Sequence, residues 1–135
     1  MDGSKLVLYE FFMSPLANGL RVMLKMGKVD FERKEVNLGK GEHRQPEYMA
    51  KNPRGKVPML QDGDFFLTES VAIAKYLCNT RPSIPEHLWP KDPIKRAHVN
   101  QLLEWFQCHY RPAYSDYMLF VIKPQMTGGE FNPEH

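Results

Sequence analysis

The stretch that most constrains the fold of this chain is residues 52–70, NPRGKVPMLQDGDFFLTES, where a proline precedes two short apolar runs. Because proline has no N–H to donate to a strand ladder, Pro58 is expected at the first residue of a strand and not inside one. The pair Asp62-Gly63 favours a tight hairpin turn between the two runs. Residues 68–70, Thr-Glu-Ser, are typical of a helix start. The stretch therefore predicts an antiparallel hairpin followed directly by a helix.

The junction between Val57 and Pro58 also indicates a binding surface. If their peptide bond is cis, the backbone N–H and C=O of Val57 face outward and can pair with an extended, peptide-like ligand. The helix that begins at Glu69 and Ser70 offers unpaired N–H groups and the positive end of its dipole to a carboxylate. The residues by themselves therefore favour a groove for a peptide-like ligand with an anion site beside it.

Composition limits the kinds of protein to which this surface can belong. The chain has 135 residues, of which 42% are hydrophobic and 12% aromatic, and a net charge of +2 with both signs interspersed. This suits one packed domain, or a small domain with part of a second. The sequence contains no basic block, so nucleic acid is not expected as a partner. It contains no long apolar run and no signal-peptide core, so neither a membrane span nor export is expected. Cys78 and Cys108 lack the spacing of a metal site, so we expect buried, reduced thiols, no metal and a cytoplasmic location.

Apolar spacing along residues 1–80 alternates between strand and helix periods. The predicted strands are residues 5–9, 31–36, 59–61 and 65–67, and the predicted helices are residues 16–28, 47–50 and 68–78. The order β-α-β-α-β-β-α is that of an α/β fold with a mixed sheet flanked by helices.

Residues 81–92 contain three prolines and are predicted to link two domains. A long helix is expected from Pro93, because apolar residues recur after it at steps of three and four. Pro112 is expected to kink or end that helix. A second helical stretch is predicted at residues 114–122, broken by Pro124.

Three segments in this order resemble one protein family: Lys56-Val57-Pro58, Asp62-Gly63-Asp64-Phe65 and Leu67-Thr68-Glu69-Ser70-Val71-Ala72-Ile73. The chain is similar to a glutathione transferase, with spacing closest to the theta class, from about Leu6 to about Arg111. The resemblance implies a thioredoxin-like, glutathione-binding domain at residues 1–80 and a linker at residues 81–92. Residues 93–135 would then be part of an all-helical domain that shapes the site for an electrophile.

By this resemblance, Ser14 is the catalytic residue whose hydroxyl hydrogen-bonds the sulfur of glutathione. The nucleophile is a thiolate, and both a hydroxyl donor and a helix N-terminus favour the charged form of a thiol. The alternative is that Ser14 only caps a helix. Tyr9 is a weaker rival, since other classes of the family use an early tyrosine.

The resemblance also implies which residues bind the rest of glutathione. His43 and Lys56 match positions near its glycine carboxylate, and Val57 offers backbone bonds to its cysteinyl residue. Glu69 and Ser70 match the γ-glutamyl end, where the helix start would take the α-carboxylate and Glu69 the α-amino group. The alternatives are solvated surface groups for His43 and Lys56, and a pair that only starts a helix for Glu69 and Ser70.

Arg111 falls where theta-type chains often carry an arginine that faces the electrophile and stabilises a departing anion. Pro112, directly after it, could redirect its side chain. Four aromatic residues nearby either line an apolar pocket or, more commonly for such spacing, pack in a core: Trp105, Phe106, Tyr110 and Tyr114.

Two features depart from the theta pattern. Pro15 directly follows Ser14, and Asn18 stands where the family has an arginine. The family's helical domain also continues well beyond the length of this chain, so the helix from Pro93 to Arg111 is expected to expose apolar surface. A homodimer is expected to cover that surface.

Conjugation of glutathione, as co-substrate, to electrophilic small molecules in detoxification is the function that the resemblance implies. The alternative is a module that binds glutathione or a partner protein and performs little catalysis. A thiol–disulfide oxidoreductase is disfavoured, because no cysteine lies near Ser14.

Overall fold

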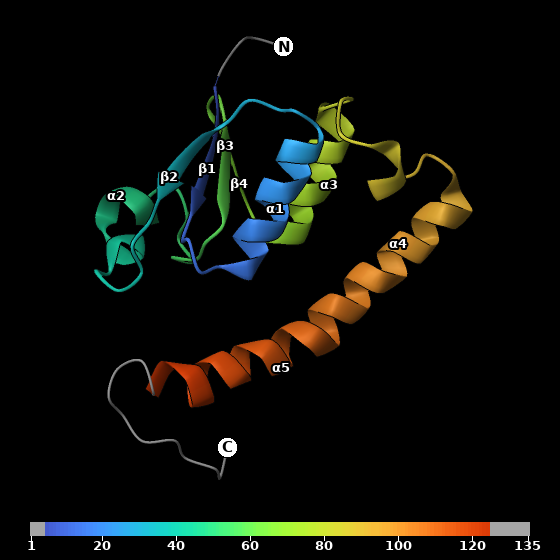
Figure 1. Ribbon diagram of the computed structural model, residues 1–135. Coiled ribbons are helices and arrows are strands. Elements are labelled where there is room, and N and C mark those ends of the chain that lie inside the picture. Colours follow the sequence, from blue (N-terminus) through green and yellow to red (C-terminus); the bar gives the residue numbers. More distant parts are fainter. Residues whose placement is uncertain (1–4, 125–135) are drawn as a thin grey trace. The chain divides into compact units, whose positions relative to one another are not determined.

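The computed structural model describes residues 5–124, which fall into two compact units, one ending at Pro90 and the other beginning at Lys91 (Figure 1). The predicted helical domain at residues 93–135 is therefore described only as far as Pro124, because residues 125–135 lie outside the described part.

The first unit is built on a four-stranded sheet with the strand order β2-β1-β3-β4. Its strands are β1 (Leu6–Glu10), β2 (Glu32–Glu35), β3 (Met59–Asp62) and β4 (Phe65–Thr68). β1 and β2 are parallel, whereas β3 is antiparallel to both of its neighbours, β1 and β4. Gly63, in the turn between β3 and β4, has φ 61°, a left-handed value that glycine adopts without steric cost. The predicted mixed sheet is confirmed.

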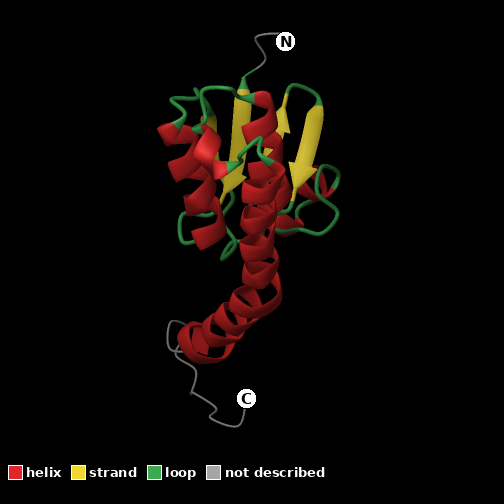
Figure 2. Ribbon diagram, turned by 90° about the vertical axis from the view of Figure 1, so that its right-hand side faces the viewer, coloured by secondary structure: helices red, strands yellow, loops and turns green. Residues whose placement is uncertain are grey.

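Helices α1 (Pro15–Met26) and α3 (Ser70–Thr80) lie side by side on one face of this sheet (Figures 1 and 2). The buried residues of α1 recur at helical spacing: Ala17, Leu20, Met23 and Leu24. They contribute to a core whose other buried residues come from two strands, from α3 and from the segment after it: Leu6, Leu8, Leu60, Ile73, Leu77 and Ile84. Much of the predicted linker thus packs on the first unit, and its short turn η2 (Glu86–Leu88) ends in a residue that contacts this core.

The opposite face of the sheet carries a smaller core. Two short helices, η1 (Glu42–Arg44) and α2 (Pro46–Met49), lie on this side (Figure 1). The buried residues of the smaller core are Tyr9, Val36, Tyr48 and Met59.

The second unit is one continuous helical segment as far as it is described. Its parts are α4 (Pro93–Trp105), the π-helical turn η3 (Phe106–Tyr110), α5 (Arg111–Asp116) and a second π-helical turn, η4 (Tyr117–Ile122). The Asp92 carboxylate begins it by accepting a hydrogen bond of 2.8 Å from the N–H of Lys95. None of the helices in the described residues is long and apolar enough to cross a membrane.

The stretch predicted at residues 114–122 is helical, and it continues the helix that begins at Pro93 without a break, so Pro112 does not end that helix. In an α-helix, proline removes a hydrogen bond and its ring collides with the carbonyl four residues earlier. The π-helical turn η3 lies directly before α5, whose second residue is Pro112, so the α-helical hydrogen-bond pattern is interrupted next to the proline. Pro124 is also helical, so the predicted break does not fall at that residue.

No side chain in the helices of this unit is fully buried as far as residue 122. Its exposed large apolar side chains are Ile94, Leu102, Trp105, Tyr110, Tyr117 and Leu119. Both cysteines are free, but Cys108, on η3, is exposed and not buried as predicted, and Cys78 is half-buried. Cys108 is not buried because its helix packs against no other element within the described part of its own unit.

Candidate functional site

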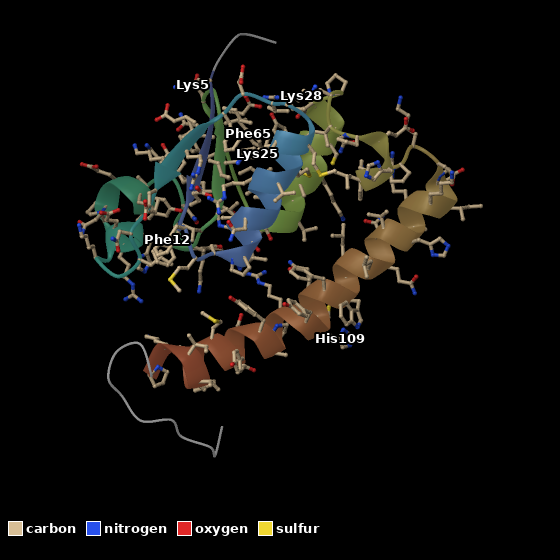
Figure 3. The ribbon with its side chains drawn as sticks, in the orientation of Figure 1. Lys5, Phe12, Lys25, Lys28, Phe65 and His109 are labelled. Carbon is tan, nitrogen blue, oxygen red and sulfur yellow. The ribbon has the colours of Figure 1, made fainter. Side chains whose placement is uncertain are left out.

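The register of the sheet brings six of the seven predicted site residues to one edge. Tyr9 in β1 lies opposite Met59 in β3, which in turn lies opposite Thr68 in β4. The end of β1, the start of β3 and the end of β4 therefore meet at the same edge, where parallel β2 also ends. Phe12 marks this edge and Lys5 the other end of β1 (Figure 3). The six predicted site residues at this edge are Ser14, His43, Lys56, Val57, Glu69 and Ser70.

The seventh predicted residue, Arg111, is the first residue of α5 and belongs to the second unit. Its role in the site therefore stays a prediction.

Ser14 is the N-cap of α1, and its Oγ accepts a hydrogen bond of 3.3 Å from the N–H of Ala17. The alternative role of a capping serine is thus present in the structure. Capping uses only an oxygen lone pair, however, and a hydroxyl can donate its proton at the same time. Pro15 fits as the first residue of α1, where its missing N–H would have no helical partner. Ser14 can therefore cap the helix and donate to a ligand together.

The Val57–Pro58 peptide bond is cis. Within residues 5–124, neither backbone polar group of half-buried Val57 has a hydrogen-bond partner. The preceding carbonyl, that of Lys56, accepts hydrogen bonds of 2.6 Å from both Tyr48 Oη and Asn52 Nδ2. The segment is thus fixed from the protein side while the polar groups of Val57 are unoccupied.

His43 lies in η1, among positive charges. Its pKa is lowered from 6.5 mainly by burial, and further by the charges of Arg44 and Lys56. Its Nε2 accepts from Arg44 Nε over 3.3 Å, whereas its buried Nδ1 has no hydrogen-bond partner within the described chain. The charges of Arg44 and Lys56 would attract an anion bound beside His43.

Glu69 and Ser70 form the start of α3. Glu69 has φ 69°, a left-handed value that is costly for a residue with a side chain, and it makes no side-chain cap to α3. Its Oε1 instead lies 2.6 Å from Arg54 Nη1. Ser70 is buried at the first position of the helix. The pair begins the helix through its backbone, and the Glu69 carboxylate is directed elsewhere.

Sequence reasoning missed four residues around this edge: Glu10, Tyr48, Asn52 and Arg54. Glu10 is the last residue of β1 and is buried between two arginines: Arg33 Nε donates to its Oε1, and Arg21 Nε lies 3.2 Å from its Oε2 without hydrogen-bond geometry. The alternation Leu6, Leu8, Glu10 was a usable signal, because it puts the carboxylate on the core face.

The predicted rival Tyr9 is buried in the smaller core. Its hydroxyl donates to Gln61 Oε1 over 2.8 Å, and its ring packs against that of Tyr48. Tyr9 is thus engaged in sheet packing.

A family model described as "Glutathione S-transferase, N-terminal domain" matches residues 4–79. The chain belongs to the glutathione S-transferase family. It is 34% identical to glutathione S-transferase T2 of Arabidopsis thaliana over 96% of this chain and 22% of that protein. It is 39% identical to human glutathione S-transferase theta-1 over 74% of this chain and 41% of that protein. The theta-like resemblance inferred from the sequence is confirmed.

Solved structures support the same assignment. A mutant of human glutathione-S-transferase T1-1 in its apo form has a TM-score of 0.85 at 34% identity, covering 96% of this chain and 54% of that one. A glutathione transferase homologue from a Drosophila species, with bound glutathione, has a TM-score of 0.77 at 30% identity, covering 88% and 55%. This glutathione S-transferase family member has the predicted thioredoxin-like domain followed by a helical region. It spans 22% of the first relative, and about half of these two solved chains.

Proposed function

We propose that this edge of the sheet binds glutathione and that the protein conjugates the glutathione thiolate to electrophilic small molecules. The observation that carries the proposal is the convergence at one edge of a hydroxyl at a helix start, a backbone N–H and C=O that have no partner within residues 5–124, and a second helix start. A related solved structure with bound glutathione supports this choice of ligand.

The proposed binding mode follows the chemistry of the tripeptide. The backbone of Val57 pairs with the cysteinyl residue, as an added strand would. Ser70 and the N–H groups at the start of α3 take the γ-glutamyl carboxylate, and Glu69 takes the α-amino group. His43 and Lys56 take the glycine carboxylate. Burial lowers the pKa of His43 most and the charges of Arg44 and Lys56 lower it further, and those two charges suit a bound anion.

The proposed reaction needs a thiolate. The thiol releases its proton to water, and the Ser14 hydroxyl and the dipole of α1 stabilise the negative sulfur. The sulfur then forms a bond to the electrophilic carbon, and the leaving group departs with the bonding electrons. Arg111 is proposed to stabilise that departing anion.

A cytoplasmic location, a role in detoxification and a homodimer complete the proposal. The exposed apolar side chains of the second unit support the homodimer, because a large unpartnered apolar surface is unfavourable in water.

The test is calorimetric titration with glutathione together with turnover of small halide and nitroaryl electrophiles. Ser14→Ala is expected to lower kcat about 100-fold, the effect of removing one donor to a developing negative charge, with glutathione binding largely kept. Ser83→Ala, an exposed serine of the same unit, is the matched control and is expected to leave both unchanged.

An unchanged rate in Ser14→Ala would remove Ser14 from the mechanism. Binding without any turnover would favour the alternative, a glutathione-binding module. A folded protein that binds no glutathione would contradict the proposal as a whole.

A further inference from the structure

Two side chains converge on the carbonyl oxygen of Lys56. Tyr48 Oη and Asn52 Nδ2 each donate to it over 2.6 Å. A carbonyl oxygen has two lone pairs, so both of its accepting positions are used. The same peptide group ends in the N–H of Val57, which has no partner within residues 5–124. In the Lys56–Val57 peptide group, the carbonyl oxygen is therefore fully hydrogen-bonded to the protein, whereas the N–H is available to a ligand.

Both donors are held by buried packing. Tyr48 lies in the smaller core and Asn52 is 1% exposed. Asn52 Oδ1 accepts from the N–H of Arg54 over 3.2 Å, and the Asn52 carbonyl accepts from the N–H of Gly55 over 2.9 Å. Burial raises the pKa of Tyr48, so its hydroxyl stays protonated and able to donate at neutral pH. The donors are thus more rigid than surface side chains would be.

We propose that Tyr48 and Asn52 are positioning residues that orient the Lys56–Val57 peptide plane and strengthen the Val57 N–H as a donor to the cysteinyl carbonyl of glutathione. A hydrogen bond accepted at the carbonyl of a peptide polarises the N–H of that peptide. Neither residue touches the ligand; each acts through one shared backbone group. This inference rests on the proposed function, which places the cysteinyl residue against Val57.

Tyr48→Phe removes one of these donors and keeps the ring. It is expected to raise the Kd for glutathione about threefold to tenfold, the range for one hydrogen bond. Tyr76→Phe is the matched control: its hydroxyl also donates a hydrogen bond, of 2.7 Å, but to Asp62. It is expected to change the Kd less than about twofold. Thermal unfolding of both variants shows that each is folded at the titration temperature.

Binding of a second ligand distinguishes a positioning role of Tyr48 from a general loosening of the structure around it. In a glutathione analogue with an ester in place of the cysteinyl–glycine amide, the cysteinyl carbonyl is a weaker acceptor. If Tyr48 acts through the Val57 N–H, Tyr48→Phe costs less affinity for the ester than for glutathione. Asn52→Ala, which removes the other donor, is expected to show the same dependence. An equal loss for both ligands, or no loss for either, would overturn the proposal.

A third readout needs no ligand. The amide nitrogen resonance of Val57 in the free protein is expected to shift in Tyr48→Phe and to stay in place in Tyr76→Phe; an unmoved resonance would overturn the proposal. If wild-type protein binds glutathione but Tyr48→Phe binds it equally well, only the positioning role fails. If wild-type protein does not bind glutathione, the proposed function fails and this role fails with it.

Discussion

His43 is the residue whose charge depends most directly on its surroundings at the sheet edge. Burial and the neighbouring cations Arg44 and Lys56 lower its pKa, which favours the neutral ring in the free protein. A carboxylate bound against these cations would raise that pKa again. The pKa of His43 is therefore sensitive both to folding and to anion binding.

The lowered pKa of His43 predicts how stability depends on pH. Its folded pKa lies below the unfolded value of 6.5, so the unfolded chain binds more protons and acid favours unfolding. The stability linked to His43 is fully present above pH 6.5 and is lost as pH falls below it toward the folded pKa. From about pH 7 to about pH 5, the free energy of unfolding by denaturant is expected to fall more steeply in wild type than in His43→Gln.

His87→Gln, at an exposed position of the same unit, serves as the control for replacing a histidine by glutamine. Equal slopes in wild type and His43→Gln would mean that the surroundings of His43 do not disfavour its charged form.

At the scale of elements, two glycines differ in whether packing requires them. Packing does not require Gly19, within α1, but it does require Gly27, directly after α1. Gly19 is exposed within α1, and an added Cβ would meet no atom within 4 Å. Gly27 is the C-cap, with φ −78°, which any residue can adopt. A Cβ there would lie 2.6 Å from Ile84 Cγ1 and 3.1 Å from Ile84 Cα. Close approach, and not backbone conformation, is the reason for glycine at position 27.

The two glycines therefore predict opposite effects of the same substitution. Gly19→Ala is expected to stabilise the protein by about 0.5–1 kcal/mol, because alanine loses less backbone entropy in a helix. Gly27→Ala is expected to destabilise it by about 1–3 kcal/mol, because Ile84 must move out of the core. Denaturant unfolding measures both changes. A stabilising Gly27→Ala would show that the Ile84 segment moves away easily.

At the scale of the whole molecule, the two units differ in how they bury apolar side chains. Among residues 5–124, the buried core residues lie in the first unit, whereas the described helices of the second bury no side chain fully. The first unit therefore has a core of its own. The second exposes several of its large apolar side chains, which is the physical basis of the proposed homodimer.

The homodimer predicts a concentration-dependent mass. Sedimentation equilibrium at micromolar concentration is expected to give twice the chain mass. Leu102→Lys is expected to weaken association about tenfold or more, because burying one leucine contributes about 1.5–3 kcal/mol. Glu104→Lys, an exposed charged position on the same helix, is the control for added charge. A compact wild-type monomer under these conditions would contradict the homodimer.

The sequence alone determined those features that depend on neighbours along the chain. The proline before β3, the hairpin after Asp62, the cap at Ser14 and the periodicity of α1 and α3 each follow from local sterics and hydrogen bonding. Together with their order, these features were sufficient for the mixed sheet, whereas the candidate site residues came from the resemblance to a family.

Only the tertiary structure decided the features that depend on residues distant in sequence. The buried ion pairs of Glu10 and the contact of Arg54 with Glu69 join residues that come together only when the strands pair. Asn52 was not among the predicted site residues, but in the folded chain it is buried and its side-chain amide donates to the carbonyl of Lys56. The π-helical turn before Pro112 was not predicted either, because the sequence indicated only a kink or an end at that proline. Hydrogen bonds and packing between distant segments form only after the chain has closed its sheet, so a one-dimensional pattern does not contain them.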